Sequence, residues 1–416
     1  MTASAYEELL ARLLPARRFG VVLGLERVRA RLDRLGAPDR ALGRVIHVGG
    51  TNGKGSTVAM IAALVRATGA RVATYTSPHL SCLRERITID PATPAFAGAL
   101  HRRGAMVGEA ELVAAAARVA AVGGDEDTFF EQITAMALVA IAAARVDVTV
   151  LEVGLGGRLD ATNAVAADVS VVTGVAIDHA AILGATLAAI AGEKAGIFKG
   201  GQSAVIGASG EAAAVPVLIA AARAAGVREL VVIDDAAIAG VPTIGLVGAH
   251  QRRNAAAAIA AVRALGLPIH GDALAHVVHP GRFERIGAVI LDGAHNPHGA
   301  AALATTLGAL GLRPTLVIAA SADKDVAGIA AALAPAVGAV IATRYQQDRA
   351  LAPAALAAYF AGATTAPDLR AALAAAPPGP VLVAGSLFLV GEARVLLLGA
   401  PADPYVVTDP PATPAT

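Results

Sequence analysis

The stretch HVGGTNGKGST, residues 47–57, combines glycines, a lysine and hydroxyl side chains in a spacing that suits phosphate binding. Glycines let backbone N–H groups approach phosphate oxygens, and a following helix adds partial positive charge. Lys54 could neutralise the terminal phosphates of a nucleotide, and Ser56 or Thr57 could reach a phosphate or bound Mg²⁺. The common pattern has the hydroxyl directly after the lysine, whereas Gly55 intervenes here. A glycine-rich turn without a ligand is the alternative.

Polar side chains are scarce near the ends of the apolar runs, so those present are candidate ligands. Glu152 lies in the run VTVLEV, where a charge is costly unless it is paired or bound to a metal. His179 follows Asp178 just past another apolar run, and Lys194 comes fifteen residues later. Each could instead be a structural polar residue, and Lys194 could form a salt bridge with Glu193.

Short β-branched runs alternate with longer Ala-rich stretches, which predicts an α/β fold with a mainly parallel sheet. In such folds ligands bind beyond the carboxyl ends of the strands. The first series of expected strands covers residues 44–50, 71–76, 146–154 and 168–175, with helices at about 54–68 and 128–145. The second series has expected strands at 288–296, 315–321, 338–344 and 380–386.

The two series predict two domains in the 416-residue chain. We expect a larger domain at residues 1–284 and a smaller α/β domain at residues 285–398. The segment PGRFERIG, residues 280–287, is the expected linker. The Pro-rich tail of residues 399–416 is expected to be a poorly ordered end.

Composition excludes several classes of protein. Hydrophobic residues make up 56% of the chain and aromatic residues 3%, so Ala, Val, Leu and Ile must build the core. A net charge of +1 argues against a large nucleic-acid-binding surface, and the single cysteine, Cys82, excludes an internal disulfide framework. The longest uncharged run, residues 326–343, is interrupted by Pro335 and predicts a helix, a turn and a strand rather than a membrane span. We expect a cytoplasmic monomer without a targeting segment or a membrane or nucleic-acid partner.

The loop GTNGKGS, residues 50–56, resembles the ATP-binding loop of the Mur ligase superfamily, in which the additional glycine is normal. Further motifs resemble one branch of it, the folylpolyglutamate synthases and dihydrofolate synthases, and the match runs from about residue 20 to 395. These motifs are YTSPHL (75–80), ERI (85–87), FFEQITAMAL (129–138), LEVGLGGRLDATN (151–163), DHAAILG (178–184), EKAGIFK (193–199), PGRFE (280–284), DGAHNPHGA (292–300), DKD (323–325) and GSLFLVGE (385–392). The resemblance implies a Mur-ligase-like P-loop ATPase domain that also binds folate, followed by a smaller C-terminal α/β domain.

The same resemblance implies an ATP-dependent amide ligase that joins L-glutamate to a folate through an acyl phosphate, with dihydropteroate as an acceptor that the sequence leaves open. A cell-wall Mur-type amino-acid ligase acting on a UDP-sugar substrate is one alternative. The motif LEVGLGGRLDATN and the lack of an obvious separate UDP-binding domain weigh against it. A P-loop nucleotide-binding switch without ligase activity is the other, and it would not need the motif DGAHNPHGA in a second domain.

Carried over residue by residue, the resemblance implies catalytic roles for Lys54, His179 and Lys194. It implies ligands for two Mg²⁺ ions at Ser56, Ser77, Glu152, His179 and Lys194, with His179 at the second ion. An ammonium group cannot ligate a metal, so Lys194 is expected to carry a CO₂-derived carbamate.

The substrates are placed by the same resemblance. ATP is expected at Thr51, Asn52, Gly53, Lys54, Gly55, Ser56, Asn254, Arg282, Asp292 and His295. The pterin or folate is expected at Leu23, Gly24, Leu25, Thr128, Phe129, Phe130, Glu131, Leu159, Asp160 and Ala161. The aromatic pair could stack on a pterin or belong to the core. Because Arg282 and Asp292 lie on opposite sides of the expected linker, closure of the two domains would complete the site.

Overall fold

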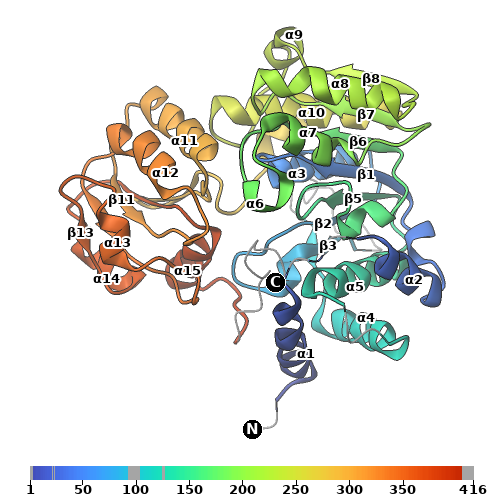
Figure 1. Ribbon diagram of the computed structural model, residues 1–416, viewed down its shortest axis with the longest axis horizontal. Helices are drawn as coiled ribbons and strands as arrows, with labels where there is room; N and C mark the ends of the chain where they lie inside the picture. Colours follow the sequence, from blue (N-terminus) through green and yellow to red (C-terminus); the bar gives the residue numbers. More distant parts are fainter. Residues whose placement is uncertain (1–2, 21, 23, 92–103, 124–126, 405–416) are drawn as a thin grey trace.

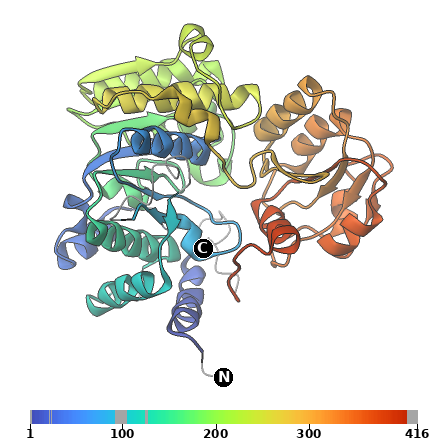
Figure 2. The ribbon, with the colours of Figure 1, turned by 180° about the vertical axis from the view of Figure 1, so that it is seen from behind.

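The computed structural model describes residues 3–404 except residues 21, 23, 92–103 and 124–126. The chain forms a larger domain, coloured blue to yellow, and a smaller domain, coloured orange to red, which lie side by side (Figures 1 and 2). Each domain has its own sheet with helices on both faces. This architecture confirms the predicted α/β class.

Within the described residues the larger sheet has 8 strands in the order β4-β3-β2-β5-β1-β6-β7-β8. Neighbouring strands are parallel along the series β2-β5-β1-β6-β7-β8. At the other end of the sheet, β3 pairs antiparallel with both β2 and β4. Their bounds are β1 Arg44–Gly49, β2 Val72–Tyr75, β3 Ile87–Ile89, β4 Ala105–Met106, β5 Val148–Glu152, β6 Val169–Val172, β7 Ser203–Ile206 and β8 Glu229–Val232.

Helices cover this sheet, and alanine allows them to pack closely. In α3 and α10 most residues are buried, and their Ala and Val side chains share one core with β1, β5 and β6. The helices are α1 Ala5–Leu13, α2 Glu26–Arg34, α3 Lys54–Ala67, α4 Glu109–Ala121, α5 Phe129–Ala144, α6 Ala180–Leu183, α7 Leu187–Ala195, α8 Val215–Ala224, α9 Asp235–Ala239 and α10 Ala249–Ala264.

The second sheet has the order β13-β12-β11-β14-β10-β9, with β9 antiparallel and the other strands parallel. Its strands are β9 Glu284–Ile286, β10 Val289–Leu291, β11 Thr315–Ile318, β12 Val340–Ala342, β13 Thr364–Thr365 and β14 Val381–Ala384. Its helices are α11 Pro297–Ala309, α12 Val326–Leu333, α13 Pro353–Ala357, α14 Leu369–Ala375 and α15 Leu387–Leu398. Since β9 begins at Glu284, the second sheet starts one residue before the predicted boundary.

The uncharged run of residues 326–343 is a helix, a short 3₁₀ turn and a strand, as predicted. Among the described residues, no helix has both the length and the apolar character needed to span a membrane.

The strands end earlier than their apolar runs predict. β5 stops at Glu152 and β6 at Val172, although the expected strands continued to residues 154 and 175. Val153 and Val175 remain buried after the last paired residue, so apolar character continues while the strand does not. The difference matters because the loops that begin there carry the polar residues of the site.

The start of the predicted tail is attached to the first domain. We call residues 399–403 the C-terminal strap. Asp403 accepts hydrogen bonds from the Leu83 N–H at 2.6 Å and the Tyr6 hydroxyl at 2.9 Å, and its own N–H donates to the Ser81 carbonyl at 2.9 Å. The Ser81 hydroxyl donates to the Pro401 carbonyl at 2.8 Å. Residues 405–416 of the predicted tail lie outside the described residues.

Candidate functional site

The phosphate loop joins β1 to α3, the arrangement that its motif requires. Gly53 caps α3 in a left-handed conformation, φ +85°, and a Cβ there would collide with the Asn254 side chain. Lys54 folds back over the loop, and its Nζ donates to the carbonyls of Gly50 and Thr51 at 3.3 Å. Ser56 lines the cavity beside the loop, whereas Thr57 does not. The structure therefore favours Ser56 as the hydroxyl that can reach a ligand.

Glu152 and Ser77 meet because their strands, β5 and β2, are neighbours in the sheet. The Ser77 N–H donates to Glu152 Oε2 at 3.3 Å. Burial raises the pKa of Glu152 to about 6, although the positive charge of Lys54 acts in the opposite direction. A buried carboxylate with one long hydrogen bond is well suited to receive a cation.

Asp178 and His179 follow β6 and face the second domain. His179 has a left-handed backbone, φ +53°, which is uncommon for a residue with a side chain. Lys324 of the second domain donates to Asp178 Oδ1 at 2.9 Å and lies 3.4 Å from His179 Nε2. Burial lowers the pKa of His179 to about 4, and Asp178 opposes this effect. The imidazole is therefore neutral at neutral pH and retains a nitrogen lone pair.

Lys194, near the end of α7, reaches the phosphate loop from the other side. Its Nζ donates to the Gly50 carbonyl at 3.1 Å, and the residue is 5% exposed. Burial, reinforced by the charge of Lys54, lowers the pKa of Lys194 to about 7. The alternative salt bridge to Glu193 is absent, because Glu193 bonds to Arg158 at 3.2 Å while Lys194 points inward.

The four residues predicted for the rest of the nucleotide line the same cavity, and local contacts hold each of them. Asn254 accepts from the Ser209 hydroxyl at 2.7 Å. Asp292 accepts from the N–H groups of Phe283 and Ala294, both at 2.9 Å, which fixes the start of the second domain. Arg282 Nη1 donates to the Gly281 carbonyl at 3.1 Å, and His295 Nδ1 lies 2.8 Å from the Gly293 carbonyl.

The residues predicted for the folate divide into two groups. Gly24, Thr128, Phe130, Glu131, Leu159, Asp160 and Ala161 line the cavity. Phe129 does not: it is fully buried in the core, with the Arg86 guanidinium 5.3 Å above its ring. Leu25 is buried and also lies away from the cavity. Leu23 is outside the described residues.

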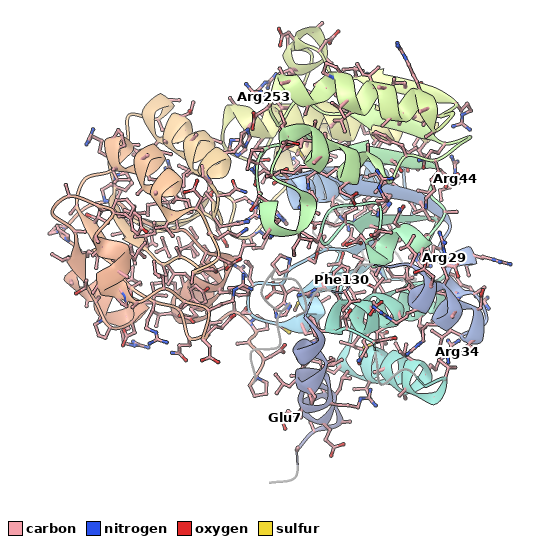
Figure 3. The ribbon with its side chains drawn as sticks, in the orientation of Figure 1. Glu7, Arg29, Arg34, Arg44, Phe130 and Arg253 are labelled. Atoms are coloured by element: carbon pink, nitrogen blue, oxygen red, sulfur yellow. The ribbon has the colours of Figure 1, made fainter. Side chains whose placement is uncertain are left out.

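The expected aromatic pair is therefore corrected to a single half-buried ring, Phe130, that lines the cavity. Consecutive residues of a helix point about 100° apart, so Phe129 and Phe130 at the start of α5 cannot both face the cavity. In Figure 3, Phe130 lies toward the second domain, whereas Arg29, Arg34 and Arg44 project from the far side of the larger domain.

Polar residues at the folate end also have structural partners. Thr128 and Glu131 form the capping box of α5, and Glu131 pairs with Arg27 at 2.8 Å. Asp160 accepts hydrogen bonds from the N–H groups of Leu155 at 2.9 Å and Thr162 at 3.0 Å. These contacts fix the shape of this part of the cavity wall.

The cavity has a volume of about 320 Å³ and is lined by both domains. The motifs DHAAILG, DKD and GSLFLVGE each supply polar residues to this cavity, and of these the sequence predicted a role for His179 alone. The polar lining residues that it did not assign include Asp178, Ser209, His250, Gln251, His298, Ser321, Lys324, Arg349 and Ser386.

The protein supplies few metal ligands by itself. Among the described residues, no three or more His, Cys, Asp or Glu side chains are placed to hold a metal ion together. Glu152, Ser56, Ser77 and His179 nevertheless face the same cavity. This donor set is compatible with Mg²⁺, which is usually held by one or two carboxylates together with substrate phosphates and water.

The chain is similar to known proteins in both sequence and fold. Residues 281–387 match the family model described as "Mur ligase, glutamate ligase domain". The chain is 40% identical over 390 residues to the dihydrofolate synthase/folylpolyglutamate synthase of Mycobacterium tuberculosis, covering 83% of this chain and 78% of that protein. It is 38% identical to the "Probable bifunctional folylpolyglutamate synthase/dihydropteroate synthase" of Haloferax volcanii, covering 94% of this chain but 50% of that protein.

Solved structures agree in fold over nearly the whole chain. The M. tuberculosis folylpolyglutamate synthase complexed with ADP superposes with a TM-score of 0.83 at 35% identity, covering 95% of this chain and 98% of that one. A bifunctional folylpolyglutamate synthase/dihydrofolate synthase with Mn, AMPPNP and L-glutamate bound superposes with a TM-score of 0.82 at 31% identity, covering 95% and 100%.

Proposed function

Because the chain belongs to the folylpolyglutamate synthase/dihydrofolate synthase family, we propose that it is an ATP-dependent ligase that joins L-glutamate to a folate. The cavity between the domains that holds the phosphate loop carries this proposal. In it a phosphate loop, a buried carboxylate and two lysines of the first domain face polar side chains of the second. A reaction among three charged substrates needs this convergence, because positioning supplies much of the rate enhancement.

ATP is assigned to the part of the cavity beside the phosphate loop. The N-terminus of α3 presents backbone N–H groups and partial positive charge to the phosphates. Lys54 would exchange the carbonyls of Gly50 and Thr51 for the terminal phosphates. Further contacts to base, ribose or phosphate are assigned to Asn52, Asn254, Arg282, Asp292 and His295.

Mg²⁺ is assigned to Ser56, Ser77, Glu152 and His179, as two ions with His179 at the second. Bound Mg²⁺ would neutralise phosphate charge and stabilise the phosphoryl group in transfer. The raised pKa of Glu152, about 6, supports this assignment. It shows that burial leaves the carboxylate charge poorly compensated in the protein alone.

Lys194 is proposed to carry the carbamate. With a pKa of about 7, a large share of this buried amine is neutral at neutral pH, which is the form that attacks CO₂. The adduct would replace a cation beside the phosphate loop with an anion that has two oxygen ligands.

The chemistry proceeds in two steps. The folate carboxylate attacks the terminal phosphorus of ATP, which forms an acyl phosphate and releases ADP. The glutamate amine then attacks the acyl carbon, and the tetrahedral intermediate expels phosphate to leave an amide. Lys54 neutralises charge on the migrating phosphoryl group throughout, and the neutral His179 stays available as a ligand.

The folate is assigned to the end of the cavity lined by Gly24, Thr128, Phe130, Glu131, Leu159, Asp160 and Ala161. Phe130 offers one aromatic face to a pterin. Dihydropteroate has the same pterin and remains a second proposed acceptor.

The chain spans about half the length of the Haloferax protein, and the proposal covers the ligase reaction alone. We further propose that the enzyme is a cytoplasmic monomer. Its one cysteine is buried and unpaired, and the described residues include no helix able to span a membrane.

A substrate panel tests the proposal. ADP release is measured with a reduced folate or dihydropteroate, with and without L-glutamate, and with a UDP-sugar peptide precursor as the alternative. We expect release that depends on both the pterin substrate and glutamate. Release that depends on the UDP-sugar substrate would instead indicate a cell-wall ligase, and release without any acceptor would indicate a nucleotide switch.

Isotope transfer tests the intermediate. With ¹⁸O in the folate carboxylate, one label is expected in the released phosphate. Retention of all the label in the folate product would exclude the acyl phosphate.

A further inference from the structure

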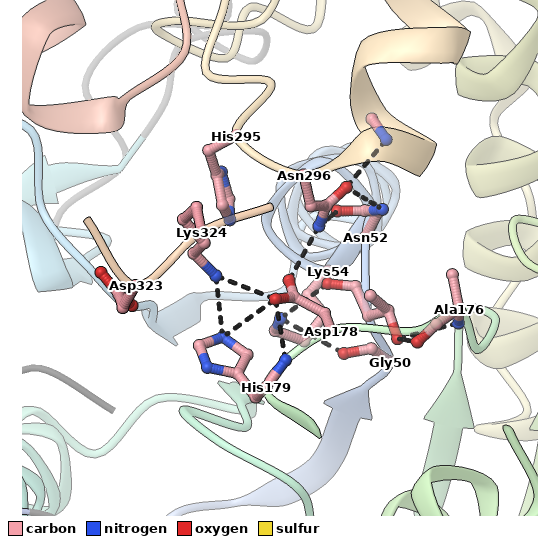
Figure 4. A network of polar contacts seen from close by, with 12 residues as sticks. Gly50, Asn52, Lys54, Ala176, Asp178, His179, His295, Asn296, Asp323 and Lys324 are labelled. Carbon is pink, nitrogen blue, oxygen red and sulfur yellow. Dashed lines mark hydrogen bonds and ion pairs between the residues drawn. The ribbon is translucent and has the colours of Figure 1, made fainter. Parts of the chain in front are cut away.

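A network of polar contacts joins the two domains beside Lys54 and His179 (Figure 4). Asn52 of the phosphate loop and Asn296 of the second domain form a reciprocal amide pair, with distances of 3.1 Å and 3.0 Å. Asn296 Nδ2 also donates to Asp178 Oδ2 at 2.8 Å. Lys324 Nζ donates to Asp178 Oδ1 at 2.9 Å and lies 3.4 Å from His179 Nε2.

Asp178 is the centre of this network, because each of its carboxylate oxygens accepts from a different loop of the second domain. Oδ1 also accepts from the backbone N–H of His179 at 2.9 Å, which fixes the peptide that carries this side chain. The Asp178 and Lys324 side chains are 11% and 9% exposed, so solvent screens the ion pair little.

Both second-domain partners lie at or next to the N-cap of a helix. Asn296 is the N-cap of α11 and accepts from the Gly299 N–H at 2.8 Å. Lys324 precedes Asp325, the N-cap of α12, and its backbone N–H donates to the Ser321 carbonyl at 3.1 Å. Both residues follow parallel strands of the second sheet, β10 and β11, so a movement of that domain displaces them together.

We propose that Lys324 and Asn296 are positioning residues that make the geometry of His179 and of the Asn52 side chain depend on closure of the domains. This inference rests on the proposed ligase function. When the domains separate, Asp178 loses its cationic and amide partners, and Asn52 loses Asn296. Nothing from the second domain then holds the left-handed backbone at His179, φ +53°. Thr51 and Ala176 exchange hydrogen bonds at 3.1 Å within the first domain, so the backbone of the phosphate loop stays attached to the segment after β6. What the second domain adds is the hold on the Asp178–His179 turn and on the Asn52 side chain.

Kinetics of matched variants provide the first test. Lys324→Met keeps most of the length of the side chain but removes its charge, and Asn296→Ser keeps a helix cap while removing the amide donor. We expect kcat to fall by about 10- to 100-fold, as for loss of a buried charged hydrogen bond, with the KM for folate changed less than about 2-fold. Lys324→Arg should recover part of kcat. Arg344→Met, which removes an exposed charge of the same domain outside the cavity, is the control.

A double-mutant cycle tests whether the residues act as a unit. Lys324→Met combined with Asp178→Asn should be no worse than the poorer single variant, because each substitution breaks the same contact. Wild-type kcat in Lys324→Met and Asn296→Ser, or losses that multiply in the double variant, would overturn the proposal.

Domain closure is measured separately from catalysis. Small-angle X-ray scattering with MgCl₂ and AMPPNP should give a larger radius of gyration for Lys324→Met than for the wild type and Arg344→Met. Equal radii would overturn the proposal, and thermal unfolding would show that each variant is folded. If the wild type releases no ADP with folate and glutamate, the proposed function fails, whereas the scattering comparison still decides the role of the network.

Discussion

Lys194 shows how burial, reinforced by a neighbouring charge, changes the chemistry of one residue. Its pKa of about 7 means that protonation below neutral pH removes the amine that would attack CO₂. We expect activity to fall as the pH decreases through 7 and to depend on bicarbonate, with a larger response to bicarbonate at lower pH. The measurement is kcat in CO₂-depleted and bicarbonate-supplied buffers from pH 6 to 8.

Substitution gives the control for this prediction. Lys194→Ala should be nearly inactive and insensitive to bicarbonate, and a small carboxylate such as acetate should partly restore it. Equal activity of the wild type in depleted and supplied buffers across this pH range would contradict the carbamate.

Lys54 is predicted to act on the charge of the phosphates in transfer. Its Nζ reaches loop carbonyls at 3.3 Å, which are weak partners that a phosphate can replace. Lys54→Ala is expected to lower kcat by about 10²-fold or more. Lys199→Ala is the matched control, because Lys199 bonds to the carbonyls of Asn163 and Val165 outside the cavity. An unchanged kcat in Lys54→Ala would remove the lysine from the mechanism.

At the scale of elements, the turn from β1 into α3 depends on Gly53. Its φ of +85° and the collision of an added Cβ with Asn254 exclude a larger residue. Gly53→Ala should weaken ADP binding at least 10-fold, measured by calorimetry, because the loop must move. Gly69→Ala is the control: Gly69 has a similar φ of +87° with nothing within 4 Å of an added Cβ. It should lower stability by about 1 kcal/mol and leave ADP binding unchanged.

The C-terminal strap, residues 399–403, is a second element with a testable role. It connects the end of α15 to the loop that carries Ser81 and Leu83. Asp403→Ala should lower the free energy of unfolding by about 1–3 kcal/mol, because it leaves buried donors without partners. Tyr6→Phe should cost about 1 kcal/mol, since it removes one hydrogen bond. Denaturant unfolding measures both, and equal stability of Asp403→Ala and wild type would show that the strap contributes nothing.

At the scale of the whole molecule, buried neutral histidines make stability depend on pH. Burial, followed by the charge of Lys199, lowers the pKa of His47 to about 3, and burial is also the main cause that lowers His295 to about 4. The unfolded chain takes up these protons below pH 6.5 and the folded protein does not, so stability present above pH 6.5 is lost as the pH falls toward 4. Each pKa unit corresponds to about 1.4 kcal/mol for a group that is fully buried.

Glu152 acts in the opposite direction. Because the pKa of Glu152 is raised to about 6, the folded protein binds a proton there at a higher pH than the unfolded chain does. This group therefore stabilises the folded protein below pH 6 and offsets part of the stability lost through the histidines. We expect the net free energy of unfolding to decrease from pH 7 to pH 5, measured by urea denaturation. His47→Gln keeps a hydrogen-bonding group near Thr162 and should flatten this decrease. The same slope in variant and wild type would contradict the assignment to His47.

The chemistry carried by single motifs was accessible from the sequence. The phosphate loop, Glu152 and His179 were predicted to lie together because each stands at or just after the end of an apolar strand, and parallel strands direct their carboxyl ends to one edge of the sheet. The structure places them around one cavity, and their roles stay predictions. The α/β class and the two sheets follow from the same alternation, and the structure confirms them. The motifs that resemble the family are distributed along most of the chain. They are short stretches of sequence, so identifying them does not require knowing how the side chains pack.

What depends on relative position was decided only by the tertiary structure. Lys324 meets Asp178 across 146 residues, and Asn296 meets Asn52 across 244, so local sequence does not specify either contact. Phe129 and Phe130 are chemically identical and adjacent, yet the rotation of α5 buries one and turns the other toward the cavity. The pKa of Lys194 is likewise a property of its surroundings, because removal of the ammonium from water is the main cause of the shift. Sequence determines which groups are present, and packing determines which of them meet and in which state of charge.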